Sequence, residues 1–122
     1  MATIDITADS FEETIEKNDI VIVDFWAEWC GPCKSFSPVY EAVSEKHDNI
    51  VFGKIDTEAE QELAGHFQIR SIPTLMIFRE QVVLYSQPGM LSAEQLEDVI
   101  SKVSAVDMAE VHAEVAKQEA ES

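Results

Sequence analysis

The pattern of apolar and polar positions divides the chain into alternating strands and helices. The β-branched run Ile20–Trp26 is apolar at nearly every position, which predicts a strand buried on both faces rather than an edge strand. From Pro32 onward, apolar residues recur at three- and four-residue spacing between Phe36 and Val43 and predict a helix that runs to about Lys46. Shorter runs predict four further strands, at residues 3–6, 50–55, 74–78 and 82–85.

Capping patterns mark the start of three more helices. A short polar side chain accepts a hydrogen bond from the first free N–H groups of a helix, and a Glu or Gln three residues later reinforces the cap. The candidate caps are Thr7, or Ser10 with Glu13, for the first helix; Thr57 with Glu60 for a short helix; and Ser92 with Gln95 for the last helix. The resulting order βαβαβαββα predicts an α/β fold with a mixed sheet, because βαβ units give parallel neighbours and the final hairpin adds an antiparallel strand.

Length and composition fit one domain followed by a short extension. A chain of 122 residues, 46% of them hydrophobic, is long enough for one core and too short for two. We place the domain at residues 1–105 and an acidic extension at residues 106–122. Met108, Val111 and Val115 recur at helical spacing in the extension, which favours a mostly exposed segment, helical or partly disordered, over a dedicated partner-binding element.

Charge and hydropathy exclude several function classes. The net charge of −16 argues against direct binding to nucleic acid or to an anionic membrane, since both need basic patches. No basic N-terminal region precedes an apolar stretch, and no apolar run approaches the length of a membrane span. We therefore expect a cytoplasmic protein without a membrane partner. Two cysteines in one local pair also fit a reducing compartment.

Both cysteines lie in the run Trp29-Cys30-Gly31-Pro32-Cys33, at the junction between the buried strand and the long helix. A thiol at a helix N-terminus faces unpaired N–H groups and the positive end of the helix dipole, which favour the thiolate. Cys30 is therefore the predicted nucleophile. Cys33 lies one turn inside the helix, where we expect it to be more buried, and is predicted to resolve a mixed disulfide formed at Cys30.

Other interpretations of the cysteine pair are core packing, a structural disulfide and a metal site. Core packing leaves the Gly-Pro insert unexplained. One CxxC supplies only two ligands of a tetrahedral metal site, and His47, His66 and His112 are scattered along the chain. We expect no metal within one chain, although a cluster shared by two chains remains an alternative.

Asp24 interrupts the buried strand with a carboxylate. An isolated buried carboxylate is costly, and burial typically raises its pKa until the neutral form exists near physiological pH. Such a group is suited to shuttle a proton. The alternative is that Asp24 is solvated at a strand end or paired with a cation.

The block from Asp24 to Lys34, together with Ile72-Pro73-Thr74 and Gly89, resembles the thioredoxin family over about residues 4–103. The resemblance implies the thioredoxin fold, a central mixed five-stranded sheet flanked by four helices, here with a C-terminal helical extension. It also implies a protein-disulfide reductase, a thiol–disulfide oxidoreductase that works by dithiol–disulfide exchange through the Cys-Gly-Pro-Cys motif.

The resemblance assigns roles to further residues. Asp24 would act through water on the resolving thiol, with Lys54 beside it on the neighbouring strand. Pro73 would be cis and lie against the cysteines, leaving the backbone of Ile72 free to pair with an extended substrate. The implied substrate-contacting residues are Trp29, Gly31, Pro32, Ile72, Pro73, Gly89 and Met90. A glycine at position 89 permits close backbone approach or simply forms a turn.

Partners and cofactors follow from the same resemblance. A flavin-containing thioredoxin reductase would restore the dithiol with NADPH, so that FAD and NADPH act only through that partner and the Cys30–Cys33 pair is the redox-active centre. A monomer that serves electron transport and cell redox homeostasis is expected.

The alternatives are a thiol oxidase or isomerase, and a binding module that uses the fold as a rigid clamp. Three features depart from the family pattern: Met90 in place of a smaller residue, a turn at 79–81 without glycine, and the extension.

Overall fold

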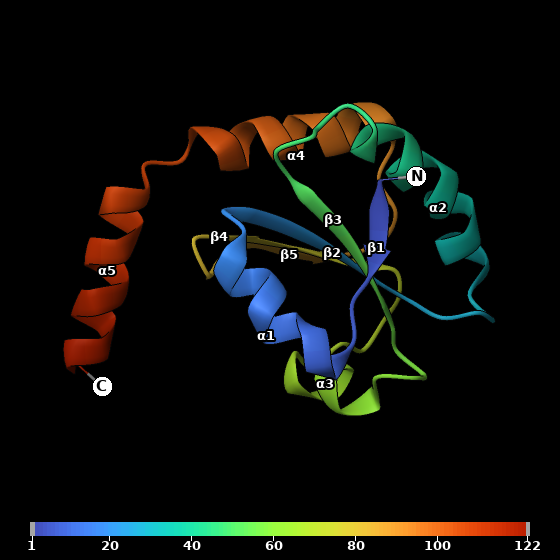
Figure 1. The fold of residues 1–122 in the computed structure, drawn as a ribbon, viewed down its shortest axis with the longest axis horizontal. Coiled ribbons are helices and arrows are strands. Elements are labelled where there is room, and N and C mark those ends of the chain that lie inside the picture. The colour runs from blue at the N-terminus through green and yellow to red at the C-terminus, as the bar shows by residue number, and fades with distance from the viewer. Residues whose placement is uncertain (1, 122) are drawn as a thin grey trace.

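Strands and helices in the computed structural model, which describes residues 2–121, follow the predicted order (Figure 1). The elements are β1 (Thr3–Asp5), α1 (Ala8–Lys17), β2 (Ile20–Trp26), α2 (Gly31–Ser44), β3 (Val51–Asp56), α3 (Gln61–His66), β4 (Thr74–Arg79), β5 (Val82–Pro88), α4 (Ala93–Ala105) and α5 (Met108–Glu121). Predicted and observed ends differ by at most three residues, as at α2, which ends at Ser44 rather than near Lys46.

The five strands form one mixed sheet in the order β1-β3-β2-β4-β5. The first three strands of that order are parallel, whereas β4 runs antiparallel to both β2 and β5. The predicted α/β fold with a mixed five-stranded sheet is therefore confirmed. Strand β2 lies at the centre of the sheet, and its register places Asp24 opposite Lys54 on β3.

Strand β2 is buried on both faces, as its apolar run predicts. Its side chains alternate between the two layers: Ile22 joins the core that α2 and α4 cover, while Val21 and Val23 join the core beneath α1 and α3. Full burial of a large aliphatic side chain contributes about 1.5–3 kcal/mol, so this strand anchors both layers. The loop after β2 is thereby held at a fixed place.

Two of the predicted helix caps are confirmed and one is wrong. Thr7 caps α1 together with Ser10, and Ser92 caps α4 together with Gln95, each as a reciprocal capping box. The alternative cap for α1, Ser10 with Glu13, is not the one used. Helix α3 has no side-chain cap. The Thr57 hydroxyl instead donates to the backbone oxygen of Trp26, and the Glu60 carboxylate accepts from the backbone N–H of Ala8 at 2.7 Å. Both side chains of the predicted cap therefore form hydrogen bonds with distant parts of the chain instead of with the start of α3.

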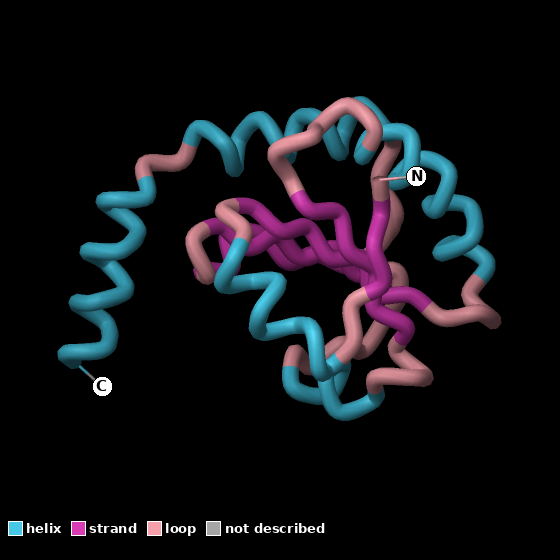
Figure 2. The backbone as a smooth tube through the Cα atoms, viewed as in Figure 1, coloured by secondary structure: helices cyan, strands magenta, loops and turns pink. Residues whose placement is uncertain are grey.

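The extension forms a separate helix, α5 (Met108–Glu121), rather than a continuation of α4. The α4 and α5 ribbons meet at a sharp bend, and α5 stands away from the sheet (Figures 1 and 2). Met108 is buried at the start of α5, and the His112 ring lies 2.8 Å from the carboxylate of Glu80. Among residues 2–121, no helix has the length and apolar character required to span a membrane.

Candidate active site

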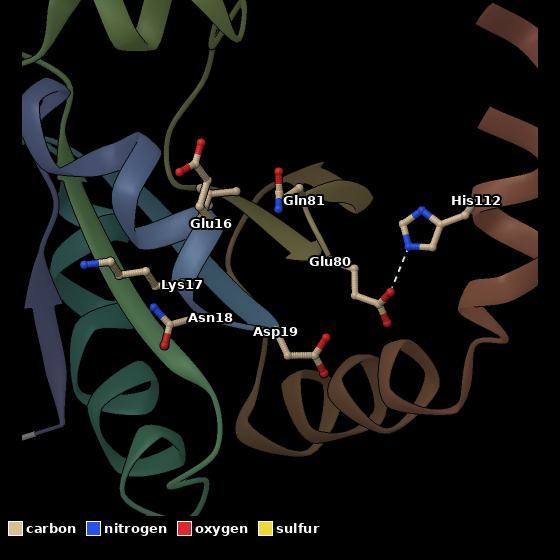
Figure 3. Close-up of a pocket in the computed structure, with 8 residues that line it drawn as sticks. Glu16, Lys17, Asn18, Asp19, Glu80, Gln81 and His112 are labelled. Atoms are coloured by element: carbon tan, nitrogen blue, oxygen red, sulfur yellow. Dashed lines mark hydrogen bonds and ion pairs between the residues drawn. The ribbon is translucent and has the colours of Figure 1, made fainter. Parts of the chain in front are cut away.

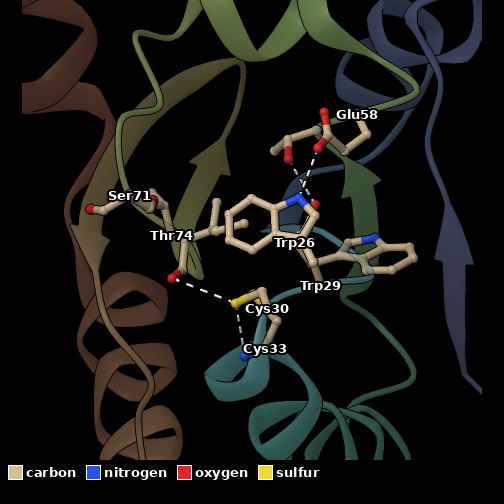
Figure 4. Close-up of a disulfide and its surroundings, with 9 residues drawn as sticks. Trp26, Trp29, Cys30, Cys33, Glu58, Ser71 and Thr74 are labelled. Atoms are coloured by element: carbon tan, nitrogen blue, oxygen red, sulfur yellow. Dashed lines mark hydrogen bonds between the residues drawn. A yellow bond between two sulfur atoms is a disulfide. The ribbon is translucent and has the colours of Figure 1, made fainter.

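Cys30 is the N-cap of α2, and Cys33 lies one turn into that helix. The two cysteines form a disulfide with their Cα atoms 5.3 Å apart (Figure 4). The backbone N–H of Cys33 donates to Cys30 Sγ at 3.2 Å, so the helix N-terminus presents a donor directly to this sulfur. Such donors stabilise negative charge on sulfur. Both side chains are only 3% exposed, which corrects the expectation that Cys33 is the more buried of the two. Both cysteines pack with Ala27, Trp26 and Ile72 in a small apolar cluster.

Gly31 and Pro32 form the first turn of α2 between the cysteines. Proline suits this position because the N–H groups of a first turn have no partner within the helix. A Cβ at position 31 would meet no atom within 4 Å, so Gly31 faces open space. The insert therefore keeps the surface above the disulfide free of bulky side chains.

Asp24 is buried beneath the site, with 1% of its side chain exposed. Neither carboxylate oxygen has a hydrogen-bond partner within residues 2–121. Burial raises the pKa of Asp24 to about 7, and the positive charge of Lys54 opposes this rise. Lys54 itself donates to Ser37 Oγ at 3.1 Å and lies over the ring of Trp26 at 5.3 Å. Asp24 can therefore exchange a proton near neutral pH.

A hollow of about 110 Å³ reaches Cys33 from the side of Lys54. Trp26, Lys34 and Ser37 also line it. A water molecule occupies about 30 Å³ in the liquid, so this space accommodates water next to the second sulfur. The hollow gives protons a route between Cys33 and the polar groups around Lys54.

The Ile72–Pro73 peptide bond is cis and lies on the other side of the disulfide. The carbonyl oxygen of Ile72 is 3.7 Å from Cys30 Sγ, and the backbone N–H of Gly89 donates to the carbonyl oxygen of Pro73 at 2.8 Å. Gly89 has φ of +100°, while no atom lies within 4 Å of where its Cβ would be. The turn conformation, rather than close backbone approach, accounts for this glycine.

Two large apolar side chains are exposed around this arrangement. Trp29 precedes Cys30 and is 69% exposed, and Met90 follows Gly89 and is 46% exposed. The Trp29 indole N–H donates to the Glu58 carboxylate at 2.7 Å. Sequence reasoning missed Glu58, because no motif connects the loop after β3 with the residue before Cys30.

The structure thus brings the residues singled out in the sequence to one end of β2. Asp24 and Lys54 lie on neighbouring strands, and Cys30 lies next to Ile72 across the cis peptide. The three histidines do not join them: His47 contacts Glu97 at 2.6 Å, His112 contacts Glu80, and His66 packs against the ring of Phe67. Within residues 2–121, no group of three or more His, Cys, Asp or Glu side chains is placed to hold a metal ion.

Comparisons with known proteins agree with this geometry. The family model for thioredoxin matches residues 2–102. A putative thioredoxin 2 of Streptomyces coelicolor is 52% identical over 121 residues, which cover 99% of this chain and 90% of that protein. The thioredoxin of Bacillus subtilis is 39% identical over 104 residues, covering 84% of this chain and 98% of its own length.

Solved structures show the same likeness. A chloroplastic thioredoxin z superposes with a TM-score of 0.79 at 28% identity, covering 87% of this chain and 97% of that one. A thioredoxin of Malassezia sympodialis superposes with a TM-score of 0.76 at 31% identity, covering 84% of this chain and 91% of the other. With the fold, the cysteine pair and these relatives in agreement, the chain belongs to the thioredoxin family.

Proposed function

We propose that this protein reduces disulfide bonds in other proteins, with Cys30 as nucleophile and Cys33 as resolving thiol. The observation that carries the proposal is the Cys30–Cys33 pair at the N-terminus of α2, where the Cys33 N–H donates to Cys30 Sγ. A backbone donor aimed at this sulfur favours the thiolate once the pair is reduced. Cys30 is also the sulfur that lies next to the Ile72 carbonyl.

The reaction proceeds in two exchanges. The Cys30 thiolate attacks one sulfur of the substrate disulfide, and the other substrate sulfur leaves as a thiolate that takes up a proton. The Cys33 thiolate then attacks Cys30 Sγ of the mixed disulfide, which releases the second substrate sulfur. Two electrons have passed to the substrate, and the Cys30–Cys33 disulfide seen in the structure is the oxidised product.

Asp24 serves as the base that takes the proton of Cys33 before the second exchange. Its raised pKa, about 7, lets it hold that proton at neutral pH and lose it again. Cys33 and Lys54 both line the hollow of about 110 Å³, and Lys54 lies opposite Asp24 in the sheet, so water in this hollow carries the proton to the neighbourhood of Asp24. Lys54 supports the ionised form of Asp24 by its positive charge.

A substrate segment binds across the surface around Cys30. The backbone of Ile72 pairs with an extended substrate chain beside Pro73, as the cis peptide and the neighbouring Cys30 sulfur favour. The exposed side chains of Trp29 and Met90 supply apolar contacts on either side. The complete set of proposed substrate contacts is Trp29, Gly31, Pro32, Ile72, Pro73, Gly89 and Met90.

A thioredoxin reductase that carries FAD and uses NADPH returns the disulfide to the dithiol, and the protein acts in the cytoplasm as a monomer in electron transport. The catalytic unit is the domain at residues 1–105, with residues 106–122 as an extension. The cysteine pair is the redox centre of the chain itself.

The test is the rate at which a small dithiol reduces a model protein disulfide in the presence of this protein or of its Cys30→Ser variant. We expect clear acceleration by the parent protein and none by the variant. Cys33→Ser serves as the matched comparison, since it should retain the first exchange and accumulate the mixed disulfide. No acceleration by the parent protein would refute the proposal and favour a binding module.

A further inference from the structure

Three hollows along α1 share lining residues and form one continuous surface. The middle hollow, about 460 Å³, lies between α1 and α3. It shares Ala8 and Leu63 with a hollow of about 250 Å³ at the start of α3. It shares Ile15, Glu16 and Gln81 with a third hollow of about 370 Å³ beside α5 (Figure 3). We call this surface, which runs from Glu58 to His112, the α1 furrow.

The floor of the α1 furrow is apolar in its middle part. Phe11 and Leu63 are half-buried there, and Phe78 is buried below them. The ring of Phe11 packs against Phe67 and Phe78 with centroid distances of 5.4 and 5.7 Å, so the floor is an ordered aromatic cluster. An open apolar surface with a polar rim is typical of a contact site for another macromolecule.

The rim of the α1 furrow carries carboxylates without cationic partners. Glu12, Glu16 and Glu62 are exposed, and none of their carboxylates has a hydrogen bond or ion pair within residues 2–121. Lys17, which lines the hollow beside α5, is already paired with Glu13 at 2.5 Å. The rim therefore complements positive charge on a bound segment.

One end of the α1 furrow touches the proposed active site, and the other end reaches the extension. Glu58 lines the hollow at the start of α3, and its carboxylate accepts a hydrogen bond from the indole N–H of Trp29. At the far end, His112 of α5 reaches toward Glu80 across the third hollow (Figure 3). A protein whose disulfide lies at Cys30 can thus continue along α1 toward α5.

We propose that the α1 furrow docks a basic amphipathic segment of the protein substrate, next to the disulfide that Cys30 attacks. Apolar side chains of that segment cover Phe11 and Leu63, and its lysines or arginines reach Glu12 and Glu16. The inference rests on the proposed function, because it names the class of substrate that the reductase prefers. Charge disfavours other occupants, since α5 contains four glutamates and one lysine and a second copy brings a net charge of −16.

The first test measures docking without any redox step. The probe is a cysteine-free synthetic helix with leucines on one face and lysines on the other, added to the oxidised protein and followed by amide chemical shifts. We expect shifts at Phe11 and Leu63, weaker binding at high salt, and no binding of the same peptide with glutamates in place of lysines. Binding of the glutamate peptide, or shifts elsewhere only, would overturn the proposal.

Matched variants separate the α1 furrow from the general acidity of the protein. Glu12→Gln with Glu16→Gln should weaken binding of the lysine peptide about fivefold, since exposed charge pairs contribute little each. Glu94→Gln with Asp98→Asn removes the same charge from α4, on the opposite layer, and should leave binding unchanged. Equal loss in both double variants would show that only the net charge attracts the peptide and would overturn the proposal.

Two further outcomes identify other occupants. Peptide-free shifts at Phe11 and Leu63 that change with protein concentration would assign the α1 furrow to a second copy. Shifts at these residues on removal of residues 107–122 would assign it to α5. Either outcome overturns docking of a substrate segment.

The second test asks whether docking aids reduction. Two disulfide peptides that differ only in a lysine-rich amphipathic tail are compared as substrates, and we expect the tail to lower KM in the parent protein but not in the Glu12→Gln, Glu16→Gln variant. If neither peptide is reduced, the proposed function fails. If both are reduced equally well, the reductase stands and the docking proposal fails.

Discussion

At the scale of single residues, the burial of Asp24 sets its pKa for proton transfer and makes the stability of the fold depend on pH. The group has a pKa of 3.8 in an exposed chain and about 7 in the fold, because burial penalises the carboxylate. Between these two values the unfolded chain loses its proton while the folded protein keeps it. The contribution of Asp24 to stability is therefore highest in acid, falls as pH rises through this interval, and stays low above pH 7.

The first prediction concerns the stability of Asp24→Asn. The variant cannot ionise, so its free energy of unfolding should exceed that of the parent by a margin that grows from about pH 4 to pH 7. The shift spans about three pH units at ~1.36 kcal/mol each, which gives roughly 4 kcal/mol at neutral pH. Urea unfolding at several pH values measures the margin, with the exposed Asp48→Asn as control. A margin independent of pH would contradict the buried, unpartnered state of Asp24.

The second prediction concerns the rate of disulfide reduction by the same variant. If Asp24 takes the proton of Cys33, its loss should slow resolution of the mixed disulfide by about a hundredfold near neutral pH. The effect should shrink at alkaline pH, where solvent base ionises Cys33 directly. Single-turnover kinetics across pH would measure it. An unchanged rate and pH profile would remove Asp24 from the mechanism.

At the scale of elements, Arg79 joins the end of β4 to the bend between α4 and α5. Its Nη1 donates to the carbonyl oxygens of Val103, Ser104 and Val106 at 2.9, 3.1 and 2.9 Å. The last carbonyls of a helix have no partner within it and carry partial negative charge, which a guanidinium compensates. One side chain thus ends α4 and fixes where α5 begins.

The third prediction tests the hydrogen bonds of Arg79 with the substitution Arg79→Met, which keeps an unbranched side chain but removes the donors. We expect a loss of about 2 kcal/mol in the free energy of unfolding, because carbonyls bonded to a charged group lose their partner. Amide hydrogens of α5 should exchange faster, while those of β2 stay protected. Lys102→Met, in the last turn of α4 but exposed, is the control. Unchanged exchange in α5 would show that Met108 and the His112 contact with Glu80 hold the helix without Arg79.

Sequence predicted those features of the elements that arise from local patterns. The apolar run of β2, the cap at Thr7 and the capping box at Ser92 depend on neighbouring residues, and the structure contains all of them. The predicted cap at Thr57 is wrong because the Thr57 hydroxyl instead donates to the carbonyl oxygen of Trp26, a residue 31 positions away. The contact of Glu58 with Trp29 escaped prediction for the same reason, since it depends on which loops lie side by side.

At the scale of the whole molecule, the sheet and four helices form a unit to which α5 is attached at one end. The thioredoxin model matches residues 2–102, whereas the Streptomyces coelicolor relative aligns over 121 residues. Within α5, Met108 is the residue that is buried, and the remaining side chains are half-buried or exposed. The Cys30–Cys33 pair lies at the N-terminus of α2, at the opposite end of the molecule from α5 (Figure 1).

The fourth prediction follows from that separation and concerns deletion of residues 107–122. The deletion leaves the carbonyls that Arg79 binds, and removes Met108 and the His112 contact with Glu80. We expect the free energy of unfolding to fall by about 2 kcal/mol, mainly from the buried Met108 side chain. Disulfide reduction of a small model substrate should stay within about twofold of the parent, because an intact sheet still positions Cys30.

Met108→Ala in the full chain is the matched control for this deletion, because it removes the buried side chain and leaves the rest of α5 in place. It should reproduce most of the stability loss, at about 2 kcal/mol for a truncated buried methionine. Urea unfolding and the reductase assay give both readouts on the same samples. A deletion that abolishes reduction while unfolding stays cooperative would mean that α5 takes part in catalysis rather than merely completing the fold.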